Sequence, residues 1–261
     1  MSIAEGQASG TGQGAGAHSA AHIFAALDAT WPAARVTQQG PWLLRDGQGG
    51  GQRVSATLLA PGMDAAAISA DDVTQAEGAQ AAATGQPPLF ALRGVDHAPL
   101  DALLAARGYV INDPTVIYAA PTAALAIEPG PVSLFPLWPP LAIMRDLWAA
   151  AGTGPARLAV MERACAPKAG LIARQSDRAV GVGFVACHDG IAMLHAVEVS
   201  PAFRRQGIGA RIVTGAAWWA QAEGATTFAL AVTAGNAGAR ALYARLGMTQ
   251  VASYHYRLKS A

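Results

Sequence analysis

Residues 197–209 read Val-Glu-Val-Ser-Pro-Ala-Phe-Arg-Arg-Gln-Gly-Ile-Gly, and this stretch predicts a strand that passes through a basic turn into a helix. Pro201 has no N–H to donate, so strand pairing should end there. The helix should begin near Gly207 and end at Gly224, a residue type that favours the position after a helix. Its apolar residues recur at helical spacing and are Ile208, Ile212, Ala216, Trp219 and Ala222.

The basic turn has the chemistry of a diphosphate site. The first N–H groups of a helix lack intrahelical acceptors, and the helix dipole adds positive charge there. Gly207 and Gly209 have no Cβ to obstruct phosphate oxygens, while Arg204 and Arg205 add charge and donors. A P-loop would need Gly-Lys-Ser/Thr, and Ile212 stands where a dinucleotide fingerprint has its third glycine. The remaining alternative is an ordinary strand–turn–helix with surface arginines.

A second strand and helix follow this unit. The alternating apolar residues of a half-buried strand are Phe228, Leu230 and Val232. Asn236 then stands as the N-cap of a helix over 237–246, which Gly247 ends. Tyr243 lies seven residues after Asn236, close to two helical turns along.

These two segments resemble the motifs of the GCN5-related N-acetyltransferase (GNAT) superfamily. The phosphate motif of that family, Gln/Arg-x-x-Gly-x-Gly/Ala, is matched by Arg-Arg-Gln-Gly-Ile-Gly at 204–209. Its later motif, Asn-x-x-Ala-x-x-x-Tyr-x-x-x-Gly-Phe, is matched except at its last position, where Met248 keeps the apolar character. The residues that match this later motif are Asn236, Ala239, Tyr243 and Gly247. The resemblance covers about residues 150–258.

The resemblance implies a fold of the α/β (α+β) class, the GNAT fold, with a twisted mixed β-sheet flanked by helices. Acetyl-CoA, or another acyl-CoA, would lie in a cleft where two central strands splay apart, and the strand ending near Val199 would pair with the pantetheine arm. An amine would attack the thioester directly, without an acyl-enzyme. No metal is expected. The implied residues that bind acetyl-CoA or coenzyme A are Val197, Val199, Arg204, Arg205, Gln206, Gly207, Ile208, Gly209, Ala210, Asn236, Ala239 and Tyr243.

Such a reaction makes three demands on the site. The amine must lose a proton to a base, the tetrahedral oxyanion needs an N–H donor, and the leaving thiolate needs a proton. By resemblance, Tyr243 supplies that proton and the N–H of Val199 is a candidate oxyanion donor. The alternative for Tyr243 is a packed aromatic on the inner face of its helix.

Glu198 is the candidate base, because it lies on the strand next to the cofactor. Asp-Gly at 189–190 predicts a two-residue hairpin turn, which places Glu198 opposite Gly181 and Ala196 opposite Gly183. Glu198 would then project from a face with little steric bulk. A bulge, usual near this point in the family, would change the register. A solvated strand carboxylate, or a water relay in place of a dedicated base, are the alternatives.

His195 is expected on the opposite face of that strand from Glu198. In the same register it lies near Phe184, so we interpret it as a packed histidine. It is not assigned a catalytic role.

Composition narrows the class of protein. The 261 residues carry a formal net charge of +1 with only 13% charged residues, so the basic excess of a nucleic-acid binder is missing. The hydrophobic fraction is 52%, but no apolar run is long enough to span a bilayer, and no signal peptide is apparent. Cys165 and Cys187 make neither a disulfide framework nor a metal pattern. These features predict a cytoplasmic protein.

The N-terminal half predicts further elements. Residues 1–18, rich in Gly, Ala, Ser and Gln, are expected to form a flexible tail. The segments expected after it are a helix over 20–29, strands over 41–45 and 53–59 joined by a glycine-rich turn at 48–51, a helix over 71–83 and a strand over 88–93.

A weaker copy of the C-terminal pattern lies in this half. Residues 100–110 echo 241–248, since in each an apolar helix ends at glycine and a strand follows, over 115–119 and 253–258. We therefore expect two GNAT-like halves, a tandem arrangement in which residues 19–125 form a degenerate N-terminal domain and residues 126–261 the catalytic domain. The alternative is a chance similarity. The proline-rich boundary holds a possible bridging strand over 132–135, and Trp138 and Trp148 are expected to cover the seam or a dimer contact.

The sequence thus predicts an N-acetyltransferase that moves an acetyl group from acetyl-CoA to a primary amine. The acceptor is expected to be a small amine, an amino acid or a protein amine. The sequence leaves open whether the protein forms a homodimer. No acidic run marks a site for polyamines, and no arginine cluster outside the basic turn marks a site for anionic acceptors. The rival hypothesis is a non-catalytic acyl-CoA-binding sensor or regulatory module.

Overall fold

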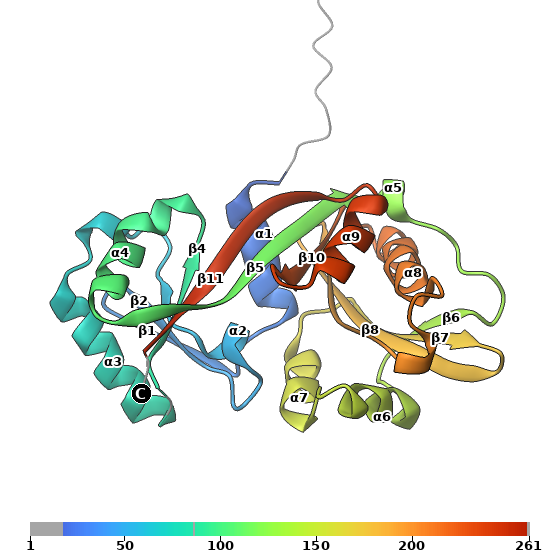
Figure 1. Ribbon diagram of the computed structural model, residues 1–261, viewed down its shortest axis with the longest axis horizontal. Coiled ribbons are helices and arrows are strands. Elements are labelled where there is room, and N and C mark those ends of the chain that lie inside the picture. The colour runs from blue at the N-terminus through green and yellow to red at the C-terminus, as the bar shows by residue number, and fades with distance from the viewer. Residues whose placement is uncertain (1–17, 86, 260–261) are drawn as a thin grey trace, which may run out of the picture.

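The computed structural model describes residues 18–85 and 87–259, so the predicted flexible tail falls almost wholly outside the described part. There the chain forms one eight-stranded mixed sheet with helices on both faces (Figure 1). From edge to edge its strands are β4 (Leu89–Arg93), β11 (Thr249–Lys259), β5 (Tyr109–Pro121), β10 (Thr227–Thr233), β9 (Ile191–Val199), β8 (Arg178–His188), β7 (Lys168–Gln175) and β6 (Leu134–Leu137). This arrangement confirms the predicted fold class.

A smaller antiparallel sheet lies beside it, made of β1 (Arg35–Gln39), β2 (Trp42–Asp46) and β3 (Leu58–Leu59). The α-helices are α1 (Ala20–Thr30), α2 (Gln52–Ser55), α3 (Ala70–Thr84), α4 (Ala98–Ala106), α5 (Thr122–Leu125), α6 (Ala142–Ala150), α7 (Pro155–Arg163), α8 (Ile208–Ala222) and α9 (Ala237–Arg245). Three short 3₁₀ turns complete the described part, η1 (Ala65–Ala67), η2 (Val95–His97) and η3 (Pro201–Phe203).

The two halves of the chain are joined by their longest strands. β5 and β11 run side by side and antiparallel across the middle of the molecule (Figure 1). β4 pairs with β11 and β10 pairs with β5, so the units β4–α4–β5 and β10–α9–β11 exchange their last strands. The echo seen in the sequence therefore corresponds to two units with the same order of elements, whose strands lie next to one another in one sheet. The division at residues 125 and 126 stays a prediction, because the sheet runs through it without a break.

Helix α8 covers one face of the C-terminal part of the sheet. Ile212 is fully buried, and the glycines of β8 make room for it. A Cβ on Gly183 would lie 2.9 Å from the Cγ2 atom of Ile212, and one on Gly181 would lie 3.0 Å from its Cδ1 atom. The other face of β8 carries Val182 and Phe184, which pack under α1, α6 and α7. Successive side chains of β8 thus point alternately to α8 and to the helices on the other face of the sheet.

Two expected elements of the N-terminal half were wrong. Residues 53–59 do not form one strand, because 52–55 turn into α2 and only Leu58 and Leu59 pair with β2. Val54, a β-branched residue that favours strands, is fully buried in a cluster with Val160, and this tertiary packing overrides its local preference. The turn at 48–51 leads into α2, and the hairpin partner of β2 is β1.

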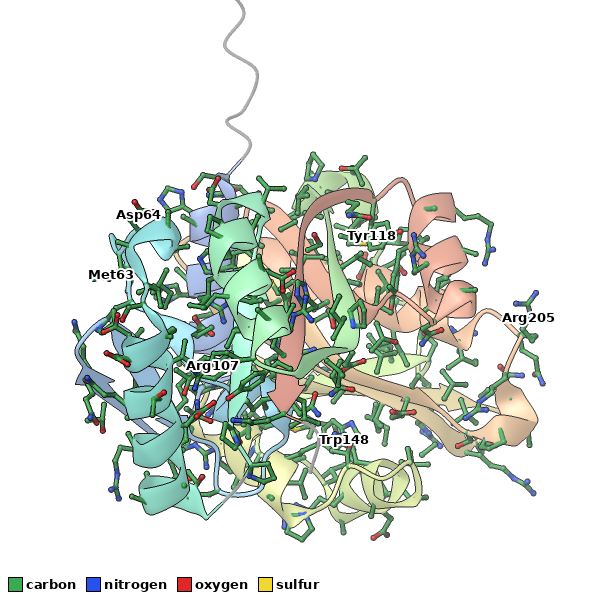
Figure 2. The ribbon with its side chains drawn as sticks, turned by 60° about the vertical axis from the view of Figure 1, so that its left-hand side comes forward. Met63, Asp64, Arg107, Tyr118, Trp148 and Arg205 are labelled. Atoms are coloured by element: carbon green, nitrogen blue, oxygen red, sulfur yellow. The ribbon has the colours of Figure 1, made fainter. Side chains whose placement is uncertain are left out.

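The predicted bridging strand at 132–135 was also wrong in its role. It appears as β6, which pairs with β7 at the far edge of the sheet. Trp148 covers the seam, one of the two places expected for it, and is fully buried together with Trp31 and Val54 from the N-terminal half, while Trp138 packs against the same cluster. The indole of Trp148 lies between α6 and the sheet (Figure 2).

The close contact between α8 and β8 gives a prediction for stability. Replacing Gly183 with Ala should lower the free energy of unfolding by about 1–3 kcal/mol, because the new Cβ must displace Ile212. The matched control is Gly78→Ala on the exposed side of α3, where nothing lies within 4 Å and helix propensity should add about 1 kcal/mol. Urea unfolding of both variants measures the difference, and equal effects would contradict the packing argument.

Candidate functional site

The site begins where β9 leaves its parallel partner. β9 and β10 pair from Ile191 and Thr227 as far as Leu194 and Leu230, and beyond this point the two strands separate. Ala196, with φ of +47°, forms a bulge in the pairing of β9 with β8. The indole Nε1 of Trp148 donates a hydrogen bond of 2.8 Å to the carbonyl oxygen of Ala196. This contact fixes the bulge and with it the opening between the strands.

The bulge corrects the predicted register by one residue. Glu198 lies opposite Val182, where Gly181 was expected, and Val199 takes the place opposite Gly181. Because neighbouring strand residues point to opposite faces, this shift turns the Glu198 side chain away from the α8 face. The expected pairing of Ala196 with Gly183 was wrong for the same reason.

The same shift changes the relation of His195 to Glu198. His195 pairs with Phe184 as predicted, but the extra residue at Ala196 brings His195 and Glu198 to the same face of the sheet. The prediction of opposite faces was therefore wrong. Val197 and Val199 point to the α8 face and pack against its core.

The backbone of β9 beyond the bulge turns one N–H group toward the opening. Ser200 N–H donates to the carbonyl oxygen of Val180 at 2.9 Å, so the alternation of an antiparallel ladder turns the N–H of Val199 away from β8. That N–H therefore faces the gap between β9 and β10.

The basic turn lies directly after this strand. Gly207, with φ of +81°, is the N-cap of α8 and provides no side chain to cap the helix, so the first N–H groups of α8 remain open to a ligand. Arg204 Nε donates to Val199 O at 3.2 Å, which ties the turn to the end of β9. Arg205 projects from the end of the molecule as an exposed side chain (Figure 2). The turn thus combines helix N–H groups with two positive charges.

A cleft of about 700 Å³ extends from this turn along α8 and α9. All of the residues predicted to bind the cofactor line it except Gln206, whose side chain hydrogen-bonds Ala202 O and Gln175 instead. The sequence did not point to five further lining residues, Phe203, Gly238, Leu242, Arg245 and Leu246. Asn236 caps α9 as predicted, accepting a hydrogen bond of 3.0 Å from Ala239 N.

Tyr243 lies on α9 at the inner wall of this cleft. Its side chain is 7% exposed, its ring centroid lies 6.0 Å from that of Tyr118, and its hydroxyl bonds no other residue in the described ranges. Burial raises the pKa of Tyr243 to about 12. The phenol is therefore protonated near neutral pH and can give a proton to a group in the cleft.

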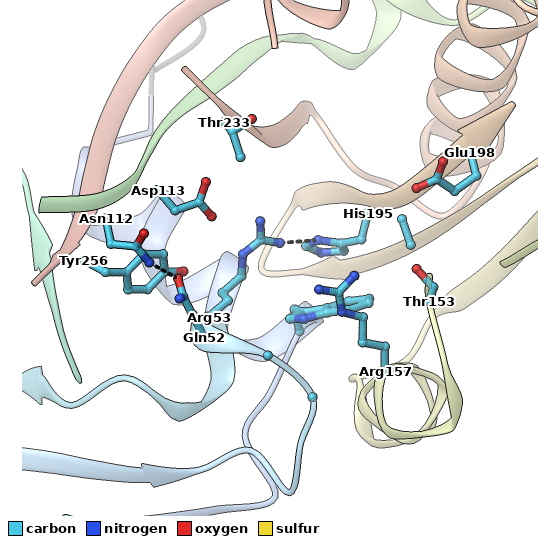
Figure 3. A pocket seen from close by; sticks show the side chains of 14 residues that line it. Gln52, Arg53, Asn112, Asp113, Thr153, Arg157, His195, Glu198, Thr233 and Tyr256 are labelled. Atoms are coloured by element: carbon cyan, nitrogen blue, oxygen red, sulfur yellow. Dashed lines mark hydrogen bonds between the residues drawn. The ribbon is translucent and has the colours of Figure 1, made fainter. Parts of the chain in front are cut away.

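A second cleft, of about 630 Å³, opens on the other side of Glu198 (Figure 3). Its walls come from both halves of the chain, including Trp31, Arg53 and Asn112 from the first and Arg157 and His195 from the second. Glu198 lines both clefts. Burial raises the pKa of the half-buried Glu198 carboxyl, while Arg204 and Arg157 act in the opposite direction. A carboxylate with a raised pKa between two clefts is suited to accept a proton.

His195 is packed, as the sequence predicted. It is 4% exposed, and its ring centroid lies 5.0 Å from that of Trp31. Burial, together with the charge of Arg53, holds the pKa of His195 well below its ordinary value, so the ring is neutral near pH 7. Its Nε2 and the Thr30 Oγ1 atom lie 2.9 Å apart.

Two side chains of the second cleft carried no signal in the sequence. Arg53 and Arg157 lie in different halves of the chain, and no short motif contains either of them.

Within residues 18–85 and 87–259, no group of three or more His, Cys, Asp and Glu side chains is arranged to hold a metal ion. No helix in those ranges is long and apolar enough to cross a membrane.

Comparison with protein families identifies the C-terminal part of the chain. Residues 141–248 match the model of the acetyltransferase (GNAT) family, so this part of the chain is a GNAT domain and the predicted resemblance is confirmed. The family indicates, in general, acyl-CoA-dependent transfer of an acetyl group to an amine, with acetyl-CoA as co-substrate. No curated protein matched the chain.

Solved structures share the fold over most of the chain. A GCN5-related N-acetyltransferase from Kribbella flavida is similar with a TM-score of 0.68 and 22% identity, covering 93% of this chain and 96% of that one. A functionally unknown conserved protein from Staphylococcus epidermidis has a TM-score of 0.65 and 14% identity, covering 89% and 96%. A tandem GNAT protein from the clavulanic acid biosynthesis pathway has a TM-score of 0.56 and 13% identity, covering 77% and 72%.

The position of the basic turn gives a prediction for coenzyme A binding. Replacing Gly207 with Val should weaken binding at least about tenfold, because a branched side chain strains a residue at φ of +81° and fills the space before the helix N–H groups. Gly224→Val is the matched control, since Gly224 has φ of +85° at the other end of α8. Calorimetric titration with coenzyme A compares them, and equal losses in both variants would mean that strain alone acts.

Proposed function

We propose that this protein transfers an acetyl group from acetyl-CoA to a primary amine by direct attack of the amine on the thioester. The observation that carries the proposal is the junction of two clefts at Glu198. One cleft holds the basic turn and Tyr243, and the other approaches the same carboxylate from the opposite face of the sheet. Two substrates entering from opposite sides would meet at the opening between β9 and β10.

The residues fit the three demands of the reaction. The acceptor enters as an ammonium and gives one proton to Glu198, and the neutral amine nitrogen then attacks the thioester carbon. The N–H of Val199 faces the opening and stabilises the oxyanion of the tetrahedral intermediate. The C–S bond breaks, the second amine proton leaves with the collapse to the amide, and Tyr243 protonates the departing thiolate. The second amine proton replaces the one that Tyr243 gave to the thiolate, and Glu198 releases its proton to solvent, so the products are the amide, free coenzyme A and one proton.

Residues 19–125 serve, in this proposal, as a degenerate GNAT-like half that builds the acceptor site. The exchange of β5 and β11 between the two units supports this interpretation. Trp31, Arg53 and Asn112 contribute to the wall of the second cleft, so the acceptor would contact both halves.

A non-catalytic sensor of acyl-CoA is the less favoured function. A sensor requires the cleft of the basic turn alone, whereas here a second cleft reaches the same carboxylate. A protonated tyrosine hydroxyl with no partner in the described ranges also serves proton transfer better than it serves binding.

Removing the hydroxyl of Tyr243 tests the proton donor. Tyr243→Phe should lower kcat by about 100-fold, because the thiolate then leaves without a proton, while the Kd for coenzyme A stays within about twofold. Tyr118→Phe is the control, since its ring lies beside that of Tyr243 while its hydroxyl accepts from Arg240. Thiol release and calorimetry give the two constants, and a kcat unaffected by Tyr243→Phe would exclude Tyr243 as the donor.

The pH dependence of turnover tests Glu198. Burial raises the pKa of Glu198 above the usual range of a glutamate, so the carboxylate form and kcat/KM should be lost as the pH falls through that raised pKa. Glu198→Gln should lower kcat/KM at neutral pH by about 100-fold and remove this acidic limb, while a limb due to the amine itself remains. Glu162→Gln, an exposed carboxylate on α7, is the control. A limb retained in Glu198→Gln would assign the base elsewhere.

A further inference from the structure

The second cleft holds a cation whose charge is not balanced by a carboxylate. Arg53 projects from α2 into the middle of the cleft and is half-buried (Figure 3). Its Nε donates to the hydroxyl of Tyr254 at 3.0 Å, and its Nη1 lies 3.5 Å from Nδ1 of His195. No carboxylate in the described ranges lies within 4.0 Å of it. By contrast, the buried guanidinium groups of Arg45 and Arg257 each pair with an aspartate.

The groups around Arg53 are neutral. Because Arg53 donates to Nδ1 of His195, the proton of the neutral ring is on Nε2, which donates to Thr30 Oγ1. The Thr30 hydroxyl in turn donates to Ala26 O at 2.7 Å. Burial also raises the pKa of Tyr256, so this tyrosine carries no negative charge near neutral pH. The chain of hydrogen bonds therefore fixes the position of Arg53 without neutralising its charge.

A second guanidinium faces the same cleft from α7. Arg157 is exposed and has no ion pair in the described ranges, and a Cβ on Gly51 would lie 3.7 Å from its Nε and Nη2 atoms. The carboxylates of the cleft are Glu198, at the junction with the other cleft, and the exposed Asp113 at the rim. The cleft thus holds two guanidinium groups, and of its two carboxylates only Glu198 also borders the cleft of the basic turn.

From this distribution we infer that the acceptor is an amine that also carries a carboxylate, of the amino-acid class, and that Arg53 binds that carboxylate while the amine lies at Glu198. The inference rests on the proposed function and adds the substrate class. A half-buried charge without a counterion is costly, and an anionic ligand removes that cost. The planar guanidinium also matches a carboxylate with two parallel hydrogen bonds.

The transfer leaves the carboxylate unchanged. The new bond joins the amine nitrogen to the acetyl carbon, the C–S bond of the thioester breaks, and the product is an N-acetyl amino acid with free coenzyme A. Acetylation removes the positive charge of the amine, so the product keeps its attraction to Arg53 but loses its contact with Glu198. The sequence pointed to no arginine cluster outside the basic turn, because Arg53 and Arg157 come together only in the folded chain.

The test compares acceptors that differ only in the carboxylate. Wild-type protein is assayed for thiol release with acetyl-CoA and each standard amino acid, and with the corresponding amino-acid amides. At least one amino acid should have a kcat/KM about tenfold or more above that of its amide, as expected for a charge-assisted hydrogen bond. Arg53→Met should lower kcat/KM for that amino acid by about 10- to 100-fold and leave the amide unchanged. Arg53→Lys should recover part of the loss.

Arg145→Met, an exposed arginine on α6, is the control and should behave as wild type. Melting temperatures of all variants identify any loss of folding. The inference is overturned if amides and amino acids are equal substrates of wild type, or if Arg53→Met impairs both classes equally. A preference for aminoalkyl phosphates over amino acids would also overturn the assignment to a carboxylate.

Failure of the proposed function has a different signature. If no amine releases thiol, the transfer reaction is refuted, and calorimetric titration of amino acids in the presence of coenzyme A still tests the site. Binding to wild type that is lost in Arg53→Met supports the assignment of Arg53 even then. An amino-acid set that does not bind wild type overturns it.

Discussion

The hydrogen bond from the Trp148 indole to the carbonyl oxygen of Ala196 is the contact on which the site depends. It holds an extra residue in β9 at the point where that strand leaves β10. Without the bulge, Glu198 would point toward α8 and His195 toward the other face. With it, Val197 and Val199 line one cleft, His195 lines the other, and Glu198 borders both. A single backbone irregularity thereby sets which side chains each substrate meets.

The exchange of the last strands places the N-terminal half within the site. β5 lies between β10 and β11, and its N-terminal part brings Asn112 and Asp113 to the mouth of the second cleft. Trp31, the residue directly after α1, and Arg53, which lies on α2, line the same cleft. Side chains from both halves of the chain therefore form the walls of this cleft.

Local signals in the sequence predicted the half of the site that binds the cofactor. Gly207, the helix that follows it and the N-cap Asn236 each act within a few residues, so their geometry is encoded where they stand. The second cleft depends on contacts between distant segments. The expected strand at 53–59 became α2 through burial of Val54 against α7, and only this change presents Arg53 to the cleft.

The register of β9 could likewise be predicted only as far as local sequence signals determine it. The Asp-Gly turn correctly fixed the pairing from His188 and Ile191 up to Phe184 and His195. The bulge beyond it requires a tryptophan from α6, about fifty residues earlier in the chain, to bind the Ala196 carbonyl. No feature of the strand itself specifies that partner, so the face of Glu198 could not be derived from alternation.

The electrostatics of Glu198 connect the two clefts. Burial raises the pKa of its carboxyl, and the opposing influences come from Arg204 in one cleft and Arg157 in the other. A diphosphate near Arg204 would offset the first of these charges, and an anionic acceptor near Arg157 would offset the second. With either anion bound, the effect of burial on the Glu198 carboxyl would be opposed less strongly. The pKa of Glu198 would then rise further, toward that of an amine. The carboxylate would be the stronger base when both clefts are occupied, which is when a proton has to be removed.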